Sequence, residues 1–168
     1  MGRRITKINH KKITKNKSEI IATENLCKCR DQCPMEGECR AKNIVYCANI
    51  KTETEGAMKT YKYYGMTSNE FIVRYRNHKS NMNCEKYKNA TELSKFIWDL
   101  KEKGIKYEIK WEIVRKAHPY QPGGKYCNLC IAEAISIAYP KKDETLINSR
   151  EEIIKNCKHK SRWKLEKY

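Results

Sequence analysis

The sequence predicts an α+β domain with one small sheet and the element order ββααβα. Three patterns support this fold class. Residues 43–66 alternate as two strands around a turn, residues 105–113 alternate strictly between apolar and charged side chains, and residues 127–139 form a largely apolar run of helical length. A chain of 168 residues is long enough for one compact domain with tails, whereas two full domains would be crowded.

The strands are predicted from their composition and from the turn between the first two. NIVYCANIK (43–51) and KTYKYYGM (59–66) are rich in β-branched and aromatic residues, and TETEGA between them supplies the turn of a β-hairpin. The third strand is IKYEIKWEI (105–113), which places isoleucine, tyrosine and tryptophan on one side and charged residues on the other.

Three helices are predicted from capping signals and apolar spacing. Thr67 and Glu70 have the spacing of a capping box and open a helix through FIVRYRNHKSNM. Asn89 and Glu92 repeat that signal for a second helix, which ends at Gly104. The third helix, CNLCIAEAISIAY, is apolar on nearly all sides, so we expect it to be buried.

The charge is strongly positive and concentrated at the ends of the chain. Thirty-six Lys and Arg against 20 Asp and Glu give a net charge of +16, which suits a polyanionic partner. We divide the chain into a basic leader (1–26), a Cys-rich segment (27–42), a folded core (43–150) and a basic C-terminal tail (151–168). Solubilising tails or a nuclear-import signal are the alternative interpretation of the basic ends.

The compartment is predicted from what the chain lacks and from its cysteines. No apolar run approaches the roughly 18 residues of a membrane span, and the N-terminus has no apolar signal-peptide stretch, so we expect an intracellular protein. In a reducing compartment the nine cysteines are better explained as metal ligands or buried thiols than as a disulfide framework.

Glu133 is the most informative residue of the third helix. A buried carboxylate without a partner costs several kcal/mol or loses its charge, so something must compensate it. One candidate is an ion pair with a nearby Lys or Arg. The other is a hard divalent cation, held by this carboxylate together with substrate phosphate and waters.

The other candidate site residues come from the hairpin and the first helix. Arg74 and His78 share a helix face and could bind the same phosphate, although a solvated basic face is the simpler alternative. Tyr46 and Tyr63 fit ordinary cross-strand packing, but a phenol near a metal or a cation could also orient or deprotonate a water.

Two short-spaced cysteine pairs predict a zinc site. Cys33-x5-Cys39 and Cys127-x2-Cys130 would form a tetrahedral Cys₄ site if the segment before the first strand lies against the start of the third helix, which makes residues 27–42 a zinc knuckle. Four further residues could replace one of these pairs or build a second site: Cys27, Cys29, Cys157 and His159.

Together these motifs resemble the GIY-YIG nuclease superfamily. The matching segments are NIVY (43–46), YYG (63–65), FIVRYRNH, AEAIS and TLINS. More specifically, CPMEGEC, KNATELSKFIWDLK (88–101), KWEI (110–113), CNLCIAE (127–133), LINSR and CKH resemble the endonuclease domain of Penelope-like retroelements over roughly residues 27 to 165. Two positions depart from the family pattern. Asn43 or Ile44 stands near the place of the usual first glycine, and Tyr64 replaces the isoleucine of the second motif.

The resemblance implies a fold and an activity for residues 43–150. The fold is a small three-stranded antiparallel sheet flanked by helices. The activity is metal-dependent cleavage or nicking of DNA that leaves a 3′-hydroxyl suited to priming reverse transcription. The implied partners are DNA and a reverse transcriptase domain of the same polypeptide with its RNA, in the nucleus. Because no polymerase is present in these residues, we expect an excised domain or a stand-alone relative.

Carried over by position, the resemblance also implies residue roles. Glu133 would bind a single Mg²⁺ or Mn²⁺, and Tyr46 together with Tyr63 would position and activate the attacking water. Arg74 would neutralise charge on the phosphorus, His78 would assist proton transfer or phosphate binding, and Asn148 would shape the site. The alternatives are a catalytically inactive zinc-containing nucleic-acid-binding module, which has no need of a lone buried glutamate, and a zinc-stabilised structural domain.

Overall fold

The computed structural model of the chain describes residues 27–29, 32–54, 56–140, 144–154 and 157. Its sheet has the strand order β3-β1-β2-β4. The strands are β1 (Ile44–Thr54), β2 (Ala57–Thr67), β3 (Tyr107–Lys116) and β4 (Thr145–Leu146), and the helices are α2 (Phe71–Asn83), α3 (Glu92–Glu102), α4 (Asn128–Ala138) and α5 (Glu151–Ile154), with a 3₁₀ turn at Glu85–Tyr87. The α+β class is therefore confirmed. No helix in the described ranges is long and apolar enough to cross a membrane.

The expected three-stranded antiparallel sheet is wrong, because a fourth strand is present. β1 pairs antiparallel with β2 and β3, but β4 pairs parallel with β2, opposite Tyr61 and Lys62. A two-residue strand has no hydrophobic period to detect. β4 is fixed instead by its neighbours, since the Glu144 carboxylate accepts hydrogen bonds from Lys62 Nζ at 2.7 Å and from Tyr64 Oη at 3.0 Å.

The β1–β2 hairpin is longer and tighter than the sequence predicts. The strands pair from Ile44 with Thr67 to Thr54 with Ala57, so only two residues remain for the turn instead of TETEGA. Gly56 has a φ of 77°, the left-handed backbone that two-residue hairpin turns require. The extra pairs continue the register and lengthen the sheet without changing which face each side chain occupies.

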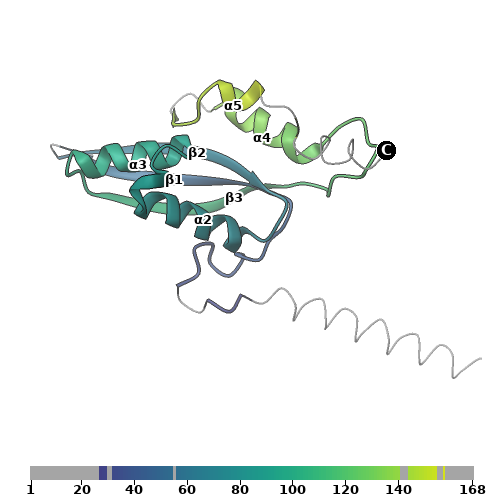
Figure 1. Cartoon of the computed structure of the whole chain (residues 1–168), viewed down its shortest axis with the longest axis horizontal. Coiled ribbons are helices and arrows are strands. Elements are labelled where there is room, and N and C mark those ends of the chain that lie inside the picture. The colour runs from purple at the N-terminus through teal and green to yellow at the C-terminus, as the bar shows by residue number, and fades with distance from the viewer. Residues whose placement is uncertain (1–26, 30–31, 55, 141–143, 155–156, 158–168) are drawn as a thin grey trace, which may run out of the picture.

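β1 is buried on both faces and separates two layers of helices. Ile44, Tyr46, Ala48 and Ile50 belong to the main core under α2 and α3, whereas Val45 and Cys47 pack on the opposite face with residues of α4. Figure 1 shows α2 and α3 on one side of the sheet and α4 and α5 on the other. The sheet therefore holds α2 and α4 at fixed positions on opposite faces.

Both predicted capping boxes are out of register with the helices. Glu70 is the N-cap of α2 and makes no capping hydrogen bond; its carboxylate lies 3.2 Å from Arg40 Nη2. Thr91 caps α3 through a reciprocal pair of hydrogen bonds with Ser94, so Glu92 is the first helical residue instead of the third. The Arg40–Glu70 ion pair takes the place of the predicted box at α2, and the Thr91–Ser94 pair takes its place at α3.

The predicted burial of the third helix is wrong for about half of its surface. α4 buries Leu129, Ala132 and Ile137 against the sheet, but Ile131 and Ile135 are 42% and 43% exposed. The sheet and α5 both contact α4, but part of its surface remains exposed. Glu133 is half-buried as a result, and not enclosed by apolar side chains as its sequence context suggests.

Candidate functional site

A buried polar group links β1 to α2 in the centre of the fold. Tyr46 has no exposed surface, and its Oη lies 2.8 Å from His78 Nε2 and 3.1 Å from Arg74 Nε. Arg74 Nε–H donates to the phenol oxygen, and the same hydroxyl shares a second hydrogen bond with His78 Nε2. The antiparallel register places Gly65 beside Tyr46, and a Cβ added at Gly65 would lie 2.5 Å from the Tyr46 hydroxyl oxygen. Because glycine has no Cβ, it allows the Tyr46 ring to lie this close to the β2 backbone.

Burial decides the charge state of this group. It lowers the pKa of His78 from 6.5 to about 3, with a further contribution from the Arg74 charge, so the imidazole is neutral. Burial also raises the pKa of Tyr46 to about 12, although Arg74 acts in the opposite direction. The pKa of Tyr63 is likewise raised, first by burial. Both phenols are therefore neutral at physiological pH.

A pocket opens beside this buried group, with a cavity volume of about 520 Å³. Its wall is built from both helical layers and from the edge of β2. It includes Tyr63 and Thr67–Asn69, Arg74 and Asn77 of α2, Cys130 and Glu133 of α4, Glu152 of α5, and Cys157. Three predicted site residues, Tyr63, Arg74 and Glu133, thus face one cavity although 70 positions separate the first from the last. Tyr46 and His78 lie directly behind Arg74 and do not line it.

Arg74 is the charged residue that connects the buried group to the pocket. Burial opposes its charge, but Tyr46, Tyr63 and Glu133 outweigh burial, and the pKa of Arg74 is raised. Glu133 also contributes to the raised pKa values of Tyr46 and Tyr63. Its carboxylate is therefore within electrostatic reach of all three side chains.

Asn148 acts on the pocket indirectly, through a second carboxylate. Its Oδ1 accepts from the Tyr64 N–H at 2.7 Å, and its Nδ2 donates to the Tyr64 carbonyl and to Glu152 Oε2, both at 2.8 Å. The side chain thus continues the pairing of β2 where β4 ends and directs Glu152 to the pocket. Glu152 was not among the predicted site residues, because residues 151–168 were interpreted as a basic tail. The available signal was its position four residues after Asn148.

The cysteines form two groups and not the single predicted set. The Sγ atoms of Cys27, Cys29 and Cys39 lie within 4.8 Å of one another, and so do those of Cys127, Cys130 and Cys157. Burial, followed by hydrogen bonds with Cys27, Cys29 and Cys33, raises the pKa of Cys39, so Cys33 also touches the first group. Either group could hold a zinc ion. His159 lies outside the described residues.

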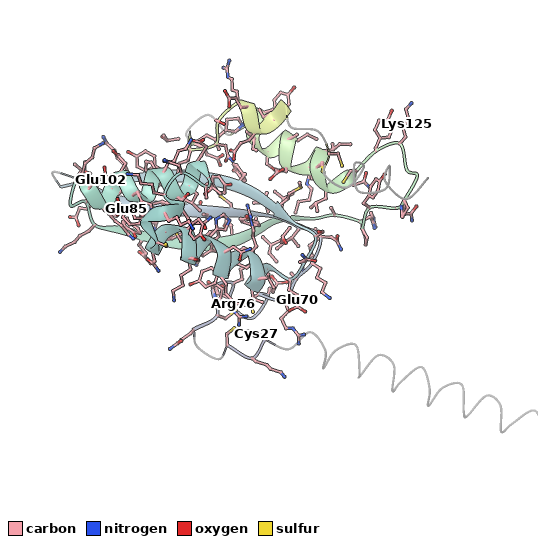
Figure 2. The ribbon with its side chains drawn as sticks, viewed as in Figure 1. Cys27, Glu70, Arg76, Glu85, Glu102 and Lys125 are labelled. Atoms are coloured by element: carbon pink, nitrogen blue, oxygen red, sulfur yellow. The ribbon has the colours of Figure 1, made fainter. Side chains whose placement is uncertain are left out.

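The two groups are on opposite sides of the molecule. Figure 2 shows Cys27 beyond α2 at one side and Lys125, two residues before Cys127, at the other. Cys33 and Cys39 therefore belong with the first group, and Cys127 and Cys130 belong to the second. The structure does not bring one predicted pair to the other. Sequence spacing indicates which cysteines form a pair. It does not indicate which other cysteines join that pair, because this depends on the tertiary contacts of each segment.

Neither a protein-family model, nor a curated protein, nor a solved structure matches the chain. A functional assignment therefore rests on the motifs and the geometry of this chain.

Proposed function

We propose that the chain is a metal-dependent DNA endonuclease of GIY-YIG type, most like the endonuclease domain of Penelope-like retroelements. The observation that carries the proposal is the shared pocket: Tyr63, Arg74 and Glu133 line it together. A guanidinium and a carboxylate in one cavity suit a phosphate and a divalent cation. The basic composition suits the polyanion that would supply the phosphate.

The donor atoms around the pocket fit Mg²⁺ or Mn²⁺. Glu133 and Glu152 offer carboxylate oxygens, the ligands that hard cations prefer, and the remaining positions are left for phosphate oxygens and waters. When bound, such an ion polarises the scissile phosphate and stabilises the leaving 3′-oxygen. Glu133 would be the principal ligand. Asn148 would keep Glu152 oriented to the cavity through its 2.8 Å hydrogen bond.

The remaining site residues would bind the phosphate and position the attacking water. Arg74 would hold a non-bridging oxygen of the phosphate in the pocket while its Nε stays on Tyr46. Tyr46 and His78 would stay neutral and would hold the Arg74 guanidinium in position, because the Tyr46 hydroxyl is hydrogen-bonded to both side chains. Because Tyr46 has no exposed surface, the attacking water would enter between Tyr63 and Arg74, which do line the cavity.

In a retroelement this cleavage would leave a 3′-hydroxyl that primes reverse transcription. The polymerase and its RNA would then be the partners of the chain, and the nucleus its location. Zinc would be a structural cofactor held by cysteines. The second candidate, a nucleic-acid-binding module without cleavage, accounts for the charge and the cysteines but gives no role to the pocket carboxylates.

The deciding experiment compares the parent chain with Glu133→Gln on supercoiled plasmid DNA in Mg²⁺ or Mn²⁺. We expect the parent to convert plasmid to open-circle or linear forms. The variant should lose about 10²-fold or more in rate, because a metal ligand that stabilises the transition state is gone. Its affinity for the same DNA in EDTA should be unchanged. Glu112→Gln, an exposed carboxylate of β3, is the matched control and should cleave like the parent.

Two outcomes would count against the proposal. If a folded parent binds DNA but leaves linear, supercoiled and branched substrates intact in both metals, the chain is the binding module. If Glu133→Gln cleaves at the parental rate, the carboxylate is not the metal ligand.

A further inference from the structure

We infer that the chain binds two zinc ions, one in each cysteine group, and that each ion fixes a different wall of the pocket. The first site is the knuckle group: Cys27, Cys29, Cys33 and Cys39. The second is the pocket group: Cys127, Cys130 and Cys157. The stoichiometry does not rest on the proposed nuclease activity, since it follows from the positions of the sulfur atoms.

The sulfur separations match a metal site better than a set of disulfides. A tetrahedral zinc with Zn–S bonds of about 2.3 Å places its sulfurs about 3.8 Å apart. Sγ of Cys39 lies 3.3 Å from that of Cys27 and 3.6 Å from that of Cys29, and Cys130 Sγ lies 3.4 Å from Cys157 Sγ. A disulfide would require about 2.05 Å. Three sulfurs lie close together in each group, whereas a disulfide would join only two of them.

The backbone of the knuckle group is arranged to support negatively charged sulfur. The Cys29 N–H donates to Cys27 Sγ at 3.2 Å, and the Gly37 N–H donates to Cys33 Sγ at 3.1 Å. The second contact depends on a tight turn in which Glu36 and Gly37 have φ values of 48° and 102°. A non-glycine residue in the left-handed region is uncommon. Metal-bound thiolates, unlike thiols, gain most from such N–H donors.

The pocket group joins the start of α4 to the segment after α5. Cys127 immediately precedes α4, Cys130 lies in its first turn, and Cys157 comes three residues after α5. Cys127 is 3% exposed, so it is held inside the protein. Structural zinc is four-coordinate, and the fourth ligand of this site comes from outside the three cysteines.

Each group is connected to a different part of the candidate site. The Cys39 carbonyl accepts from the Ile72 N–H at 2.7 Å, which ties the knuckle group to the first turn of α2, the helix of Arg74. Cys130 and Cys157 themselves line the pocket together with Glu133 and Glu152. The knuckle zinc therefore positions the cationic wall, and the pocket zinc positions the two carboxylates.

The test is the metal content of the full chain and of single variants. Elemental analysis of the purified chain is expected to give two zinc ions per chain, and Cys29→Ser and Cys157→Ser one each. The double variant is expected to give none. Cys84→Ser, an exposed cysteine outside both groups, is the control and keeps both ions.

A second measurement uses the unmodified chain, so that it remains informative if the variants fail to fold. Titration of the unmodified chain with a chromophoric chelator should release zinc in two steps, and replacement by Co²⁺ should give thiolate charge-transfer absorption for two ions. One zinc per chain, lost completely in either single variant, would overturn the inference in favour of one shared site. A folded chain with no zinc would overturn it outright. Absence of DNA cleavage with two zinc ions bound would refute the proposed function alone.

Discussion

At Tyr46 a hydroxyl with no contact to solvent lies between a guanidinium and an imidazole. Buried polar groups are costly unless each finds a partner, and here three side chains satisfy one another: Arg74 Nε–H donates to Tyr46 Oη, which shares a second hydrogen bond with His78 Nε2. No buried side-chain nitrogen or oxygen in the described residues lacks a hydrogen-bond partner. The arrangement is therefore a fully hydrogen-bonded part of the core.

His78 should make the fold sensitive to acid. Its pKa is lowered to about 3 in the folded chain, against 6.5 ordinarily, so protonation favours the unfolded state. The stabilisation is complete above pH 6.5 and falls by up to about 1.4 kcal/mol per pH unit between pH 6.5 and 3. Urea unfolding of the parent and of His78→Gln between pH 4 and 8 should show a flatter profile for the variant.

The comparison needs a control because other groups also titrate in that range. His118→Gln removes an exposed histidine and should keep the parental profile. If His78→Gln shows the same loss of unfolding free energy with falling pH as the parent, His78 does not carry the effect.

Gly65→Ala should displace Tyr46. The added methyl would lie 2.5 Å from Tyr46 Oη and 2.7 Å from Cζ, which is too close for a ring held in the core. We expect a loss of about 1–3 kcal/mol in the free energy of unfolding. The double variant with Tyr46→Ala should lose less free energy of unfolding than the sum of the two single losses, since the ring that the added methyl meets is removed. Strict additivity in urea unfolding would show that the two residues do not clash.

Residue identities in the candidate site were only partly predictable. Glu133 could be selected because a carboxylate is unusual in an apolar helix, whereas Tyr63 and Arg74 follow from the family resemblance and not from their local patterns. Glu152 could not, because its significance depends on a hydrogen bond to Asn148 and on a four-residue helix inside a segment dominated by lysine. Residue type and spacing do not indicate which side chains a short irregular segment will bring to a cavity.

At the scale of elements, the Asn148 side chain pairs with the backbone of β2 as a neighbouring strand would. Its carboxamide pairs with both backbone groups of Tyr64 and with Glu152. In Asn148→Asp, an oxygen would replace the donating nitrogen and face a carbonyl and a carboxylate. We expect a loss of about 1–3 kcal/mol in the free energy of unfolding, measured in urea. Asn83→Asp adds the same charge at an exposed position and should be nearly neutral. Equal effects of the two changes would indicate that the amide of Asn148 is dispensable.

Elements with a strong period were predicted well, and those fixed by tertiary contacts were not. β3 was predicted from its strict alternation, and its burial alternates accordingly. β4 has no period and depends on the open edge of β2. The capping boxes failed for different reasons: at α3 the Thr91–Ser94 pair has the same spacing as Asn89–Glu92 and forms instead. For α2, Glu70 is held by Arg40, a residue 30 positions away.

At the scale of the whole molecule, the charge predicts a strong salt dependence of DNA binding. Each neutralised phosphate contributes about −0.9 to the slope of log K against log salt concentration. Residues 1–17 carry seven Lys and Arg and no acidic residue. Removing residues 1–26 should therefore make the slope less negative by up to about 6. Fluorescence anisotropy across salt concentrations measures it, and an unchanged slope would show that the leader does not contact phosphates.

The central position of β1 has a consequence for synthesis. β1 pairs with β2 directly after it, but its other neighbour ends only at Lys116, about 60 residues later. At about 5–20 residues per second, the nascent chain carries an apolar strand with one unpaired edge for roughly 3–12 seconds. During that interval, strand addition from another polypeptide competes with folding. Slow translation between residues 54 and 107 should therefore lower the yield of folded protein, whereas slow translation after residue 116 should not.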